Sequence, residues 1–235
     1  RDFGRSYATR QPVLTMIGQQ IGPTLQLALS AAAVSACVGI ILGSIAAMYR
    51  NSWIDSLIRV LSLIYLSAPS FWIGLMLIIL FSFTIPIFPA TGNVGIKSLV
   101  LPAITLGLSA AGTVTRLTRN SVLEVLNENF VTSLYSRGLS KRVVIMKHVL
   151  RNAIIPTVTV VGLQIGGLIA GAVIVETVFA RRGIGQMLVQ AIGSQDFPVV
   201  QGVVLVIAVS YITLNIIVDV SYAYIDPRVR DAVKR

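Results

Sequence analysis

Long apolar runs, separated by short polar segments, make up most of this chain. Five of them are long enough to cross a bilayer as α-helices, which takes about 20 residues. They cover residues 21–49, 59–85, 99–117, 154–178 and 199–223. The pattern predicts an all-α integral membrane protein with five spans. Pro69 lies inside the second predicted span, where it is expected to free a backbone carbonyl and kink the helix.

Three pairs of glycines within the predicted spans stand four positions apart. This spacing lets two membrane helices approach closely. We therefore expect close helix contacts at the three pairs, which are Gly39 and Gly43, Gly162 and Gly166, and Gly167 and Gly171.

The composition agrees with a membrane protein and excludes several other classes. Of the 235 residues, 55% are hydrophobic and only 12% are charged. That charged share is roughly half of what a soluble domain carries, and it also rules out a disordered chain. A single cysteine, Cys37, and a single histidine exclude an internal disulfide and a His/Cys metal cage. The net charge of +10 comes from basic residues between apolar runs, which favours a membrane surface over nucleic acid.

The distribution of basic residues predicts the orientation, because Lys and Arg concentrate in cytoplasmic connections. Of the 19 basic residues, 13 lie in one set of connections, which includes the C-terminal tail at 224–235. This set is predicted to be cytoplasmic, so that residues 1–20 are external. Those residues contain no apolar anchor, and the chain begins with Arg. We therefore expect a further span upstream of residue 1, which would make six in the complete protein.

The cytoplasmic connection at residues 118–153 is the longest. Apolar residues at helical spacing predict one helix, which Gly138 ends with a positive φ angle; these residues are Val122, Val125, Leu126, Phe130 and Leu134. Ser140 is then expected to cap a second, short, basic helix from Lys141. From the residues alone, such a segment fits a helix on anionic lipid as well as a docking site for a protein.

The external connection at residues 179–198 is predicted to form a short helix with one apolar face. Gly183 and Gly185 are expected to interrupt helical structure before this helix. Its apolar face is then formed by Met187, Leu188, Ala191 and Ile192. Glu176 precedes Arg181 and Arg182, so an external ion pair is expected there. A gate over the outer mouth of a transport path and a helix lying on lipid are two readings of equal weight, and the gate candidates are Gly183, Gly185, Met187, Gln190 and Asp196.

Several motifs along the whole chain resemble one family. RGLSKRVVIMKHVLRNAIIP at 137–156 is similar to the cytoplasmic coupling loop of bacterial ATP-binding-cassette importer permeases. The chain most resembles the B-type subunits of the oligopeptide, dipeptide and nickel branch. This closer resemblance comes from DFGRSY at 2–7, SAPSFWIGL at 67–75, LPAITLGL at 101–108, ETVF at 176–179, DFPVVQG at 196–202 and DPRVR at 226–230. The Glu-Ala-Ala of the family's loop is replaced here by Thr132, Ser133 and Leu134, so the role of that Glu cannot be carried over.

The resemblance implies a type I importer permease fold whose first span is missing here, in a bacterial inner membrane with the C-terminus inside. It implies a second, paralogous permease subunit, cytoplasmic ATPase subunits and an external solute-binding protein as partners, besides membrane lipid and without nucleic acid. The solute would be a di- or oligopeptide, with nickel or another solute as the alternative. The ATPase-coupling residues would be Gly138, Leu139, Ser140, Lys141, Arg142, Val143, Val144, Lys147 and His148.

The chain itself is not expected to be an enzyme or to need a cofactor. None of its four lysines follows a glycine, so no Walker A loop is present and ATP hydrolysis must come from a partner. No carboxylate dyad or Ser–His–Asp set is readable. An ion-coupled carrier or channel without ATPase subunits is the alternative from another class. The spans at 21–49 and 99–117 contain no acidic residue, which counts against it.

Overall fold

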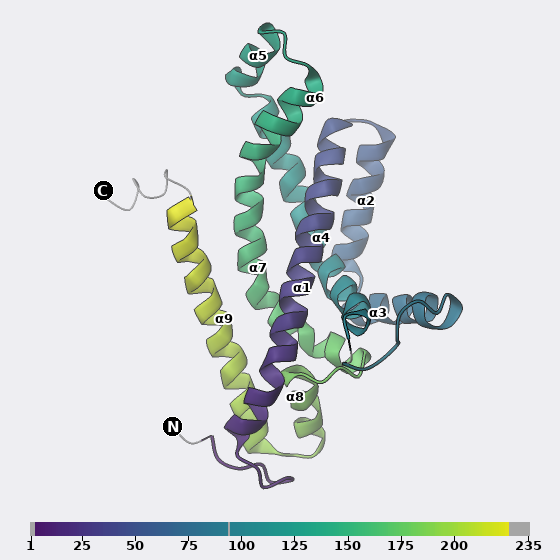
Figure 1. The fold of residues 1–235 in the computed structure, drawn as a ribbon, viewed down its shortest axis with the longest axis vertical. Coiled ribbons are helices and arrows are strands. Elements are labelled where there is room, and N and C mark those ends of the chain that lie inside the picture. Colours follow the sequence, from purple (N-terminus) through teal and green to yellow (C-terminus); the bar gives the residue numbers. More distant parts are fainter. Residues whose placement is uncertain (1–2, 94, 226–235) are drawn as a thin grey trace. The chain divides into compact units, whose positions relative to one another are not determined.

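The structure is a computed structural model that describes residues 3–93 and 95–225. The predicted motif at 226–230 and the rest of the C-terminal tail lie outside the described residues. Figure 1 shows the described chain as helices joined by short connections. In order, these are α1 Val13–Met48, α2 Trp53–Ser67, α3 Ser70–Ile78, the π-helix η1 Ile79–Thr84, α4 Lys97–Leu126, α5 Asn129–Ser136, α6 Lys141–Val143, the π-helix η2 Val144–Val149, α7 Leu150–Val178, α8 Ile184–Gly193 and α9 Phe197–Ile225.

Four helices in the described residues are long and apolar enough to cross a membrane, or five if the helices on either side of Pro69 together form one span. The predicted effect of Pro69 is confirmed and is stronger than a kink, because the helix of this span is interrupted there. Ala68 and Pro69 are both extended, with ψ angles of 131° and 134°, and they separate α2 from α3. Proline has no N–H to donate, and its ring disfavours the helical conformation in the preceding residue, so the helix ends there.

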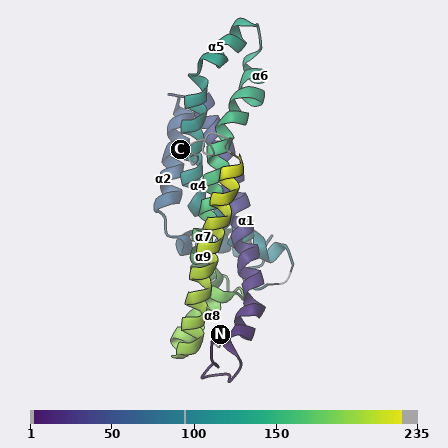
Figure 2. The ribbon, with the colours of Figure 1, turned by 90° about the vertical axis from the view of Figure 1, so that its left-hand side faces the viewer.

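The described chain folds as two compact units, and the first contains residues up to 32, 69–107 and 163 onwards. Its core joins the first turns of α1 to α8 and to the first turns of α9, which lie side by side in Figures 1 and 2. The buried members are Val13, Ile17, Ile184, Met187, Ala191, Val199 and Val203. This packing explains why α1 begins at Val13, well before the apolar run predicted from residue 21.

The second unit contains residues 33–68 and 108–162. Its core is formed by Ala47, Val122, Val131, Val144, Val149 and Ala153. Gly39 and Gly43 lie against α4, where a Cβ atom would collide with Val114 and with the carbonyl oxygen of Thr115. The predicted close packing of this glycine pair is confirmed. In the first unit, by contrast, a Cβ atom added at Gly167 would meet nothing within 4 Å outside its own helix.

Candidate functional site

The predicted coupling residues lie in the turn between α5 and α6 and in the start of the helix that follows it. Gly138 has a φ angle of +78°, which confirms the predicted left-handed conformation, and its N–H donates to the carbonyl of Tyr135 at 2.9 Å. The single helix predicted before it is wrong, because α4 ends at Leu126 and α5 begins at Asn129. Ser140 occupies the N-cap position as predicted, but its side chain makes no capping hydrogen bond.

The helix that begins at Lys141 is not short or separate. It continues through η2 into α7, as one apolar helix over Lys141–Val178. Packing of α5 against η2 places Val144 fully inside the core of the second unit. Val144 therefore anchors the turn and is not part of its surface, in contrast to its predicted role as a coupling contact.

The other predicted coupling residues lie at or near the surface. Leu139 and His148 are half-buried, and the exposed ones are Gly138, Ser140, Lys141, Arg142, Val143 and Lys147. Sequence reasoning missed Met146, whose side chain is 59% exposed beside Val143. The turn and the start of the helix at Lys141 thus present exposed apolar side chains within a basic surface.

A fully buried carboxylate, Glu176 of α7, organises the start of α8. Its Oε1 accepts from the hydroxyl of Thr24 at 2.6 Å, and its Oε2 accepts from the backbone N–H groups of Gly185 at 2.9 Å and Gln186 at 3.2 Å. The Thr24 hydroxyl oxygen in turn accepts from the N–H of Ile184 at 3.0 Å. The first N–H groups of a helix have no partner within it and carry partial positive charge, so a carboxylate is well placed there.

The ion pair expected between Glu176 and the arginines that follow it is wrong. Within the described residues neither arginine lies within 4.0 Å of its carboxylate. Arg181 is buried and donates from Nη2 to Gln26 at 3.1 Å, while the exposed Arg182 is held through its backbone N–H by the side chain of Asn93 at 2.9 Å.

Close contacts require glycine at both Gly183 and Gly185. The prediction that Gly185 interrupts the chain before the helix is wrong. Gly185 lies inside α8, where a Cβ atom would collide with the backbone of Val173, and a Cβ on Gly183 would collide with the carboxylate of Glu176. Of the predicted apolar face, Met187 and Ala191 are buried, whereas Ile192 is 59% exposed. Gln190 is exposed.

Asp196, the last gate candidate, joins the N-terminal segment to the turn between α8 and α9. Its carboxylate accepts from the Ser6 hydroxyl and from the backbone N–H groups of Tyr7 at 3.0 Å and Ala8 at 3.4 Å. Burial opposes its ionisation, but the hydrogen bonds from Ser6, Tyr7 and Ala8 outweigh burial and hold the pKa of Asp196 below its ordinary value. Its stabilising contribution is therefore present above the ordinary carboxyl pKa and is lost only as the pH falls through the lowered one.

A second polar site, in the second unit, was also missed. Asp55 in the first turn of α2 is fully buried and receives two hydrogen bonds from Arg119 of α4, at 2.7 and 2.8 Å. It also accepts from the backbone N–H of Asn51 at 3.1 Å. The sequence signal for such a partner was Asp55 itself, a single acidic residue in the first turn of a largely apolar helix.

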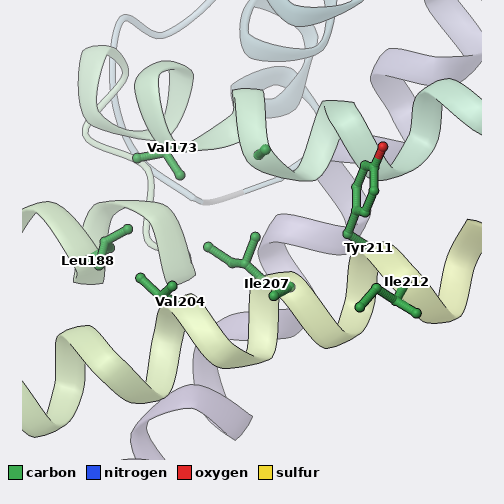
Figure 3. A pocket seen from close by; sticks show the side chains of 8 residues that line it. Val173, Leu188, Val204, Ile207, Tyr211 and Ile212 are labelled. Atoms are coloured by element: carbon green, nitrogen blue, oxygen red, sulfur yellow. The ribbon is translucent and has the colours of Figure 1, made fainter.

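An apolar groove of about 460 Å³ lies in the first unit between α7, α8 and α9 (Figure 3). Its lining is aliphatic except for Tyr211, whose ring extends toward α7. Apart from that hydroxyl it offers a polar solute no hydrogen-bonding group, so we assign it no role in solute recognition. Within residues 3–93 and 95–225 no group of three or more His, Cys, Asp or Glu side chains could hold a metal ion.

Comparison with known proteins gives consistent matches over almost the whole chain. Residues 39–231 match the family described as binding-protein-dependent transport system inner membrane component. A putative peptide transport system permease protein of Brucella abortus (strain 2308) is 40% identical, over 97% of this chain and 76% of its own length. The dipeptide transport system permease protein DppB of Haemophilus influenzae is also 40% identical, over 97% and 77%. The glutathione transport system permease protein GsiC of Escherichia coli (strain K12) is 38% identical, over 97% and 75%.

Two solved structures have a similar fold. One is an inward-facing conformation of the MetNI methionine ABC transporter, with a TM-score of 0.76 and 16% identity over 91% of this chain and 97% of that one. The other is an amino acid ABC transporter crystallised with histidines, with a TM-score of 0.69 and 12% identity over 90% and 94%. At these identities the likeness concerns the fold alone.

Proposed function

Because this chain belongs to the family of binding-protein-dependent transport system inner membrane components, we propose that it is a permease subunit of an ATP-driven importer for di- or oligopeptides. The observation that carries the proposal is the 40% identity to peptide and dipeptide permeases over 97% of the chain. A second, paralogous permease completes the path, an external binding protein delivers the solute, and separate cytoplasmic subunits hydrolyse ATP. The C-terminus is cytoplasmic in this arrangement.

Stimulation of ATP hydrolysis tests the function and the solute together. The chain is reconstituted with its partner permease, ATPase subunits and binding protein, and a dipeptide, a longer peptide and Ni²⁺ are compared as solutes. Peptide-dependent stimulation is the expected result. Stimulation by Ni²⁺ alone would select the nickel alternative, and solute uptake that continues without any ATPase subunit would select the carrier or channel.

The turn around Gly138 is proposed to contact the ATPase. Its support is the exposed surface formed by the turn and the start of the helix at Lys141, which the core of the second unit holds in place through Val144. Movement of the ATPase pair on ATP binding then displaces this turn, and the helix that continues from it carries the motion into the membrane.

Gly138→Pro should reduce ATP-driven transport at least ~10-fold while the protein still inserts. Proline fixes φ near −65° and has no N–H, so it can adopt neither the +78° angle nor the bond to Tyr135. Gly138→Asn is the matched control, because asparagine tolerates this conformation. Transport and co-purification of the ATPase are measured for both variants, and normal transport by the proline variant would contradict the assignment.

The segment of α8 is proposed as an external gate. Its support is that Glu176 and the glycine contacts fix the start of α8, while Gln190 on its other side is exposed and free to meet the partner permease. Gln190→Cys should then cross-link to a cysteine in the partner permease with a yield that changes on addition of ATP. A yield that is the same with and without nucleotide would leave α8 as a helix resting on lipid.

A further inference from the structure

The described N-terminal residues form a closed loop, which we call the N-terminal loop (residues 4–12). The N–H of Ser6 donates to the carbonyl of Gln11 at 3.0 Å, and the N–H of Arg10 donates back to the carbonyl of Ser6 at 3.0 Å. The N–H of Val13 closes the loop on Gly4 at 3.1 Å. These bonds set the backbone of the loop before any partner binds.

The loop is also fastened to the rest of the first unit. The Asp196 carboxylate holds three successive residues of the loop, through the Ser6 hydroxyl and the N–H groups of Tyr7 and Ala8. The N–H of Asp196 donates to the carbonyl of Ala191 at 2.8 Å, which fixes the carboxylate itself. The backbone positions that carry the side chains of the loop are therefore fixed, although the Tyr7 side chain itself is 67% exposed.

Among the side chains of this unit that the structure describes, the exposed charges all have one sign. Glu176 and Asp196, its acids with described side chains, are buried and hydrogen-bonded. Its exposed charged residues in the described range are Arg5, Arg10, Lys97 and Arg182, and no ion pair among the described residues involves them. Two of these four cations are in the N-terminal loop, on either side of Tyr7.

Arginine and tyrosine are the residue types that most often dominate protein interfaces, and a loop fixed in advance loses little entropy when a partner binds. Attraction to anionic lipid needs neither a fixed backbone nor a particular register. We propose that the N-terminal loop is a docking surface for the external binding protein, and that Arg5, Tyr7 and Arg10 contact an acidic patch on that protein. This inference rests on the proposed function, which supplies the binding protein and the external location of the loop.

The test uses the complete complex in zwitterionic nanodiscs, with the solute-binding protein of the same transport system saturated with a peptide. The measured quantity is the concentration of binding protein that gives half-maximal stimulation of ATP hydrolysis. Arg5→Glu and Tyr7→Ala should each raise it about 10-fold, and the effect of Arg5→Glu should shrink at high salt. Arg10→Asn removes the other charge, with a residue that tolerates the φ angle of +62° at this position.

Lys97→Glu is the matched control, because it changes an exposed charge of the same unit outside the loop. It should raise the half-maximal concentration much less than Arg5→Glu, and basal hydrolysis and assembly should be unchanged in all variants. Stimulation that every loop variant retains at wild-type concentrations would overturn the docking surface. The basal hydrolysis of each variant is also measured without binding protein in anionic nanodiscs. A loss of activity seen only there would overturn the docking surface too, since it would assign the loop to lipid. A wild-type complex that binding protein does not stimulate would instead overturn the proposed function itself.

Discussion

Glu176→Ala should lower the free energy of unfolding by about 3 kcal/mol or more. Two buried donors, the hydroxyl of Thr24 and the N–H of Gly185, lose their acceptor, and so does the half-buried N–H of Gln186. Each buried donor left without a partner costs roughly 1–3 kcal/mol. The thermal unfolding midpoint of the protein in nanodiscs measures the effect, and the gate proposal adds that ATP-dependent cross-linking at Gln190 should be lost with it.

Gly183 provides a sharper version of this experiment. The three atoms nearest to a Cβ on Gly183 all belong to the Glu176 carboxylate. Gly183→Ala should therefore be strongly destabilising in the wild type and much less so in the Glu176→Ala background. The interaction energy from this double-mutant cycle should be at least about 1 kcal/mol, well above the additivity error of distant sites.

Two further variants separate the hydrogen bonds from the charge. Glu176→Gln keeps one acceptor oxygen and should be intermediate between wild type and Glu176→Ala. Glu124→Ala removes an exposed carboxylate and should change stability by less than about 0.5 kcal/mol. Equal stabilities for Glu176→Ala and Glu124→Ala, or additive effects of Gly183→Ala and Glu176→Ala, would show that Glu176 does not hold α8 in place.

Features set by nearby residues were readable from the sequence. Apolar runs located the helices that can span a membrane, because length and hydropathy are local properties. Gly138 was identified as a left-handed turn residue for the same reason. The interruption at Pro69 was predicted as a kink from the chemistry of proline itself. The start of α1 at Val13 was not predicted, because packing on α8 and α9 extends this helix.

The polar contacts of the candidate sites depend on residues that are far apart in the chain. Ser6 and Asp196 are separated by 190 positions, and Thr24 and Glu176 by 152. The motifs that contain Ser6, Glu176 and Asp196 suggested a family, but no spacing rule pairs such distant residues. Glu176 was assigned to the nearest arginines instead, whereas the structure satisfies it with a hydroxyl and the N-terminus of a helix.

Asp55→Asn and Arg119→Leu should each lower the free energy of unfolding by roughly 3 kcal/mol, because removing one partner leaves the other charge buried and unpaired. The Asp55 side chain has no solvent exposure, and that of Arg119 is only 16% exposed. Arg59 also lies 3.5 Å from Asp55, but its side chain is 52% exposed and contributes little. Thermal unfolding in nanodiscs is again the measurement.

Geometry as well as charge should matter at this pair. Both Nε and Nη2 of Arg119 donate to Asp55, one to each carboxylate oxygen, and a lysine has a single ammonium group that cannot reproduce this arrangement. Arg119→Lys should therefore recover only part of the loss caused by Arg119→Leu. Arg116→Lys and Arg116→Leu on the same helix are the matched controls, since Arg116 is exposed, and both should stay within about 0.5 kcal/mol of the wild type.

The double variant Asp55→Leu with Arg119→Leu distinguishes a stabilising ion pair from one that mainly avoids a buried unpaired charge. Replacing both charged partners with apolar residues removes the desolvation cost together with the attraction, so the double variant should be more stable than either single variant. The double variant should still be less stable than the wild type, because the backbone N–H of Asn51 loses its acceptor, Asp55. Asn51 has a φ angle of +63°. Additive losses in the double variant would instead mean that the two side chains act independently, and that the pair does not hold α2 against α4.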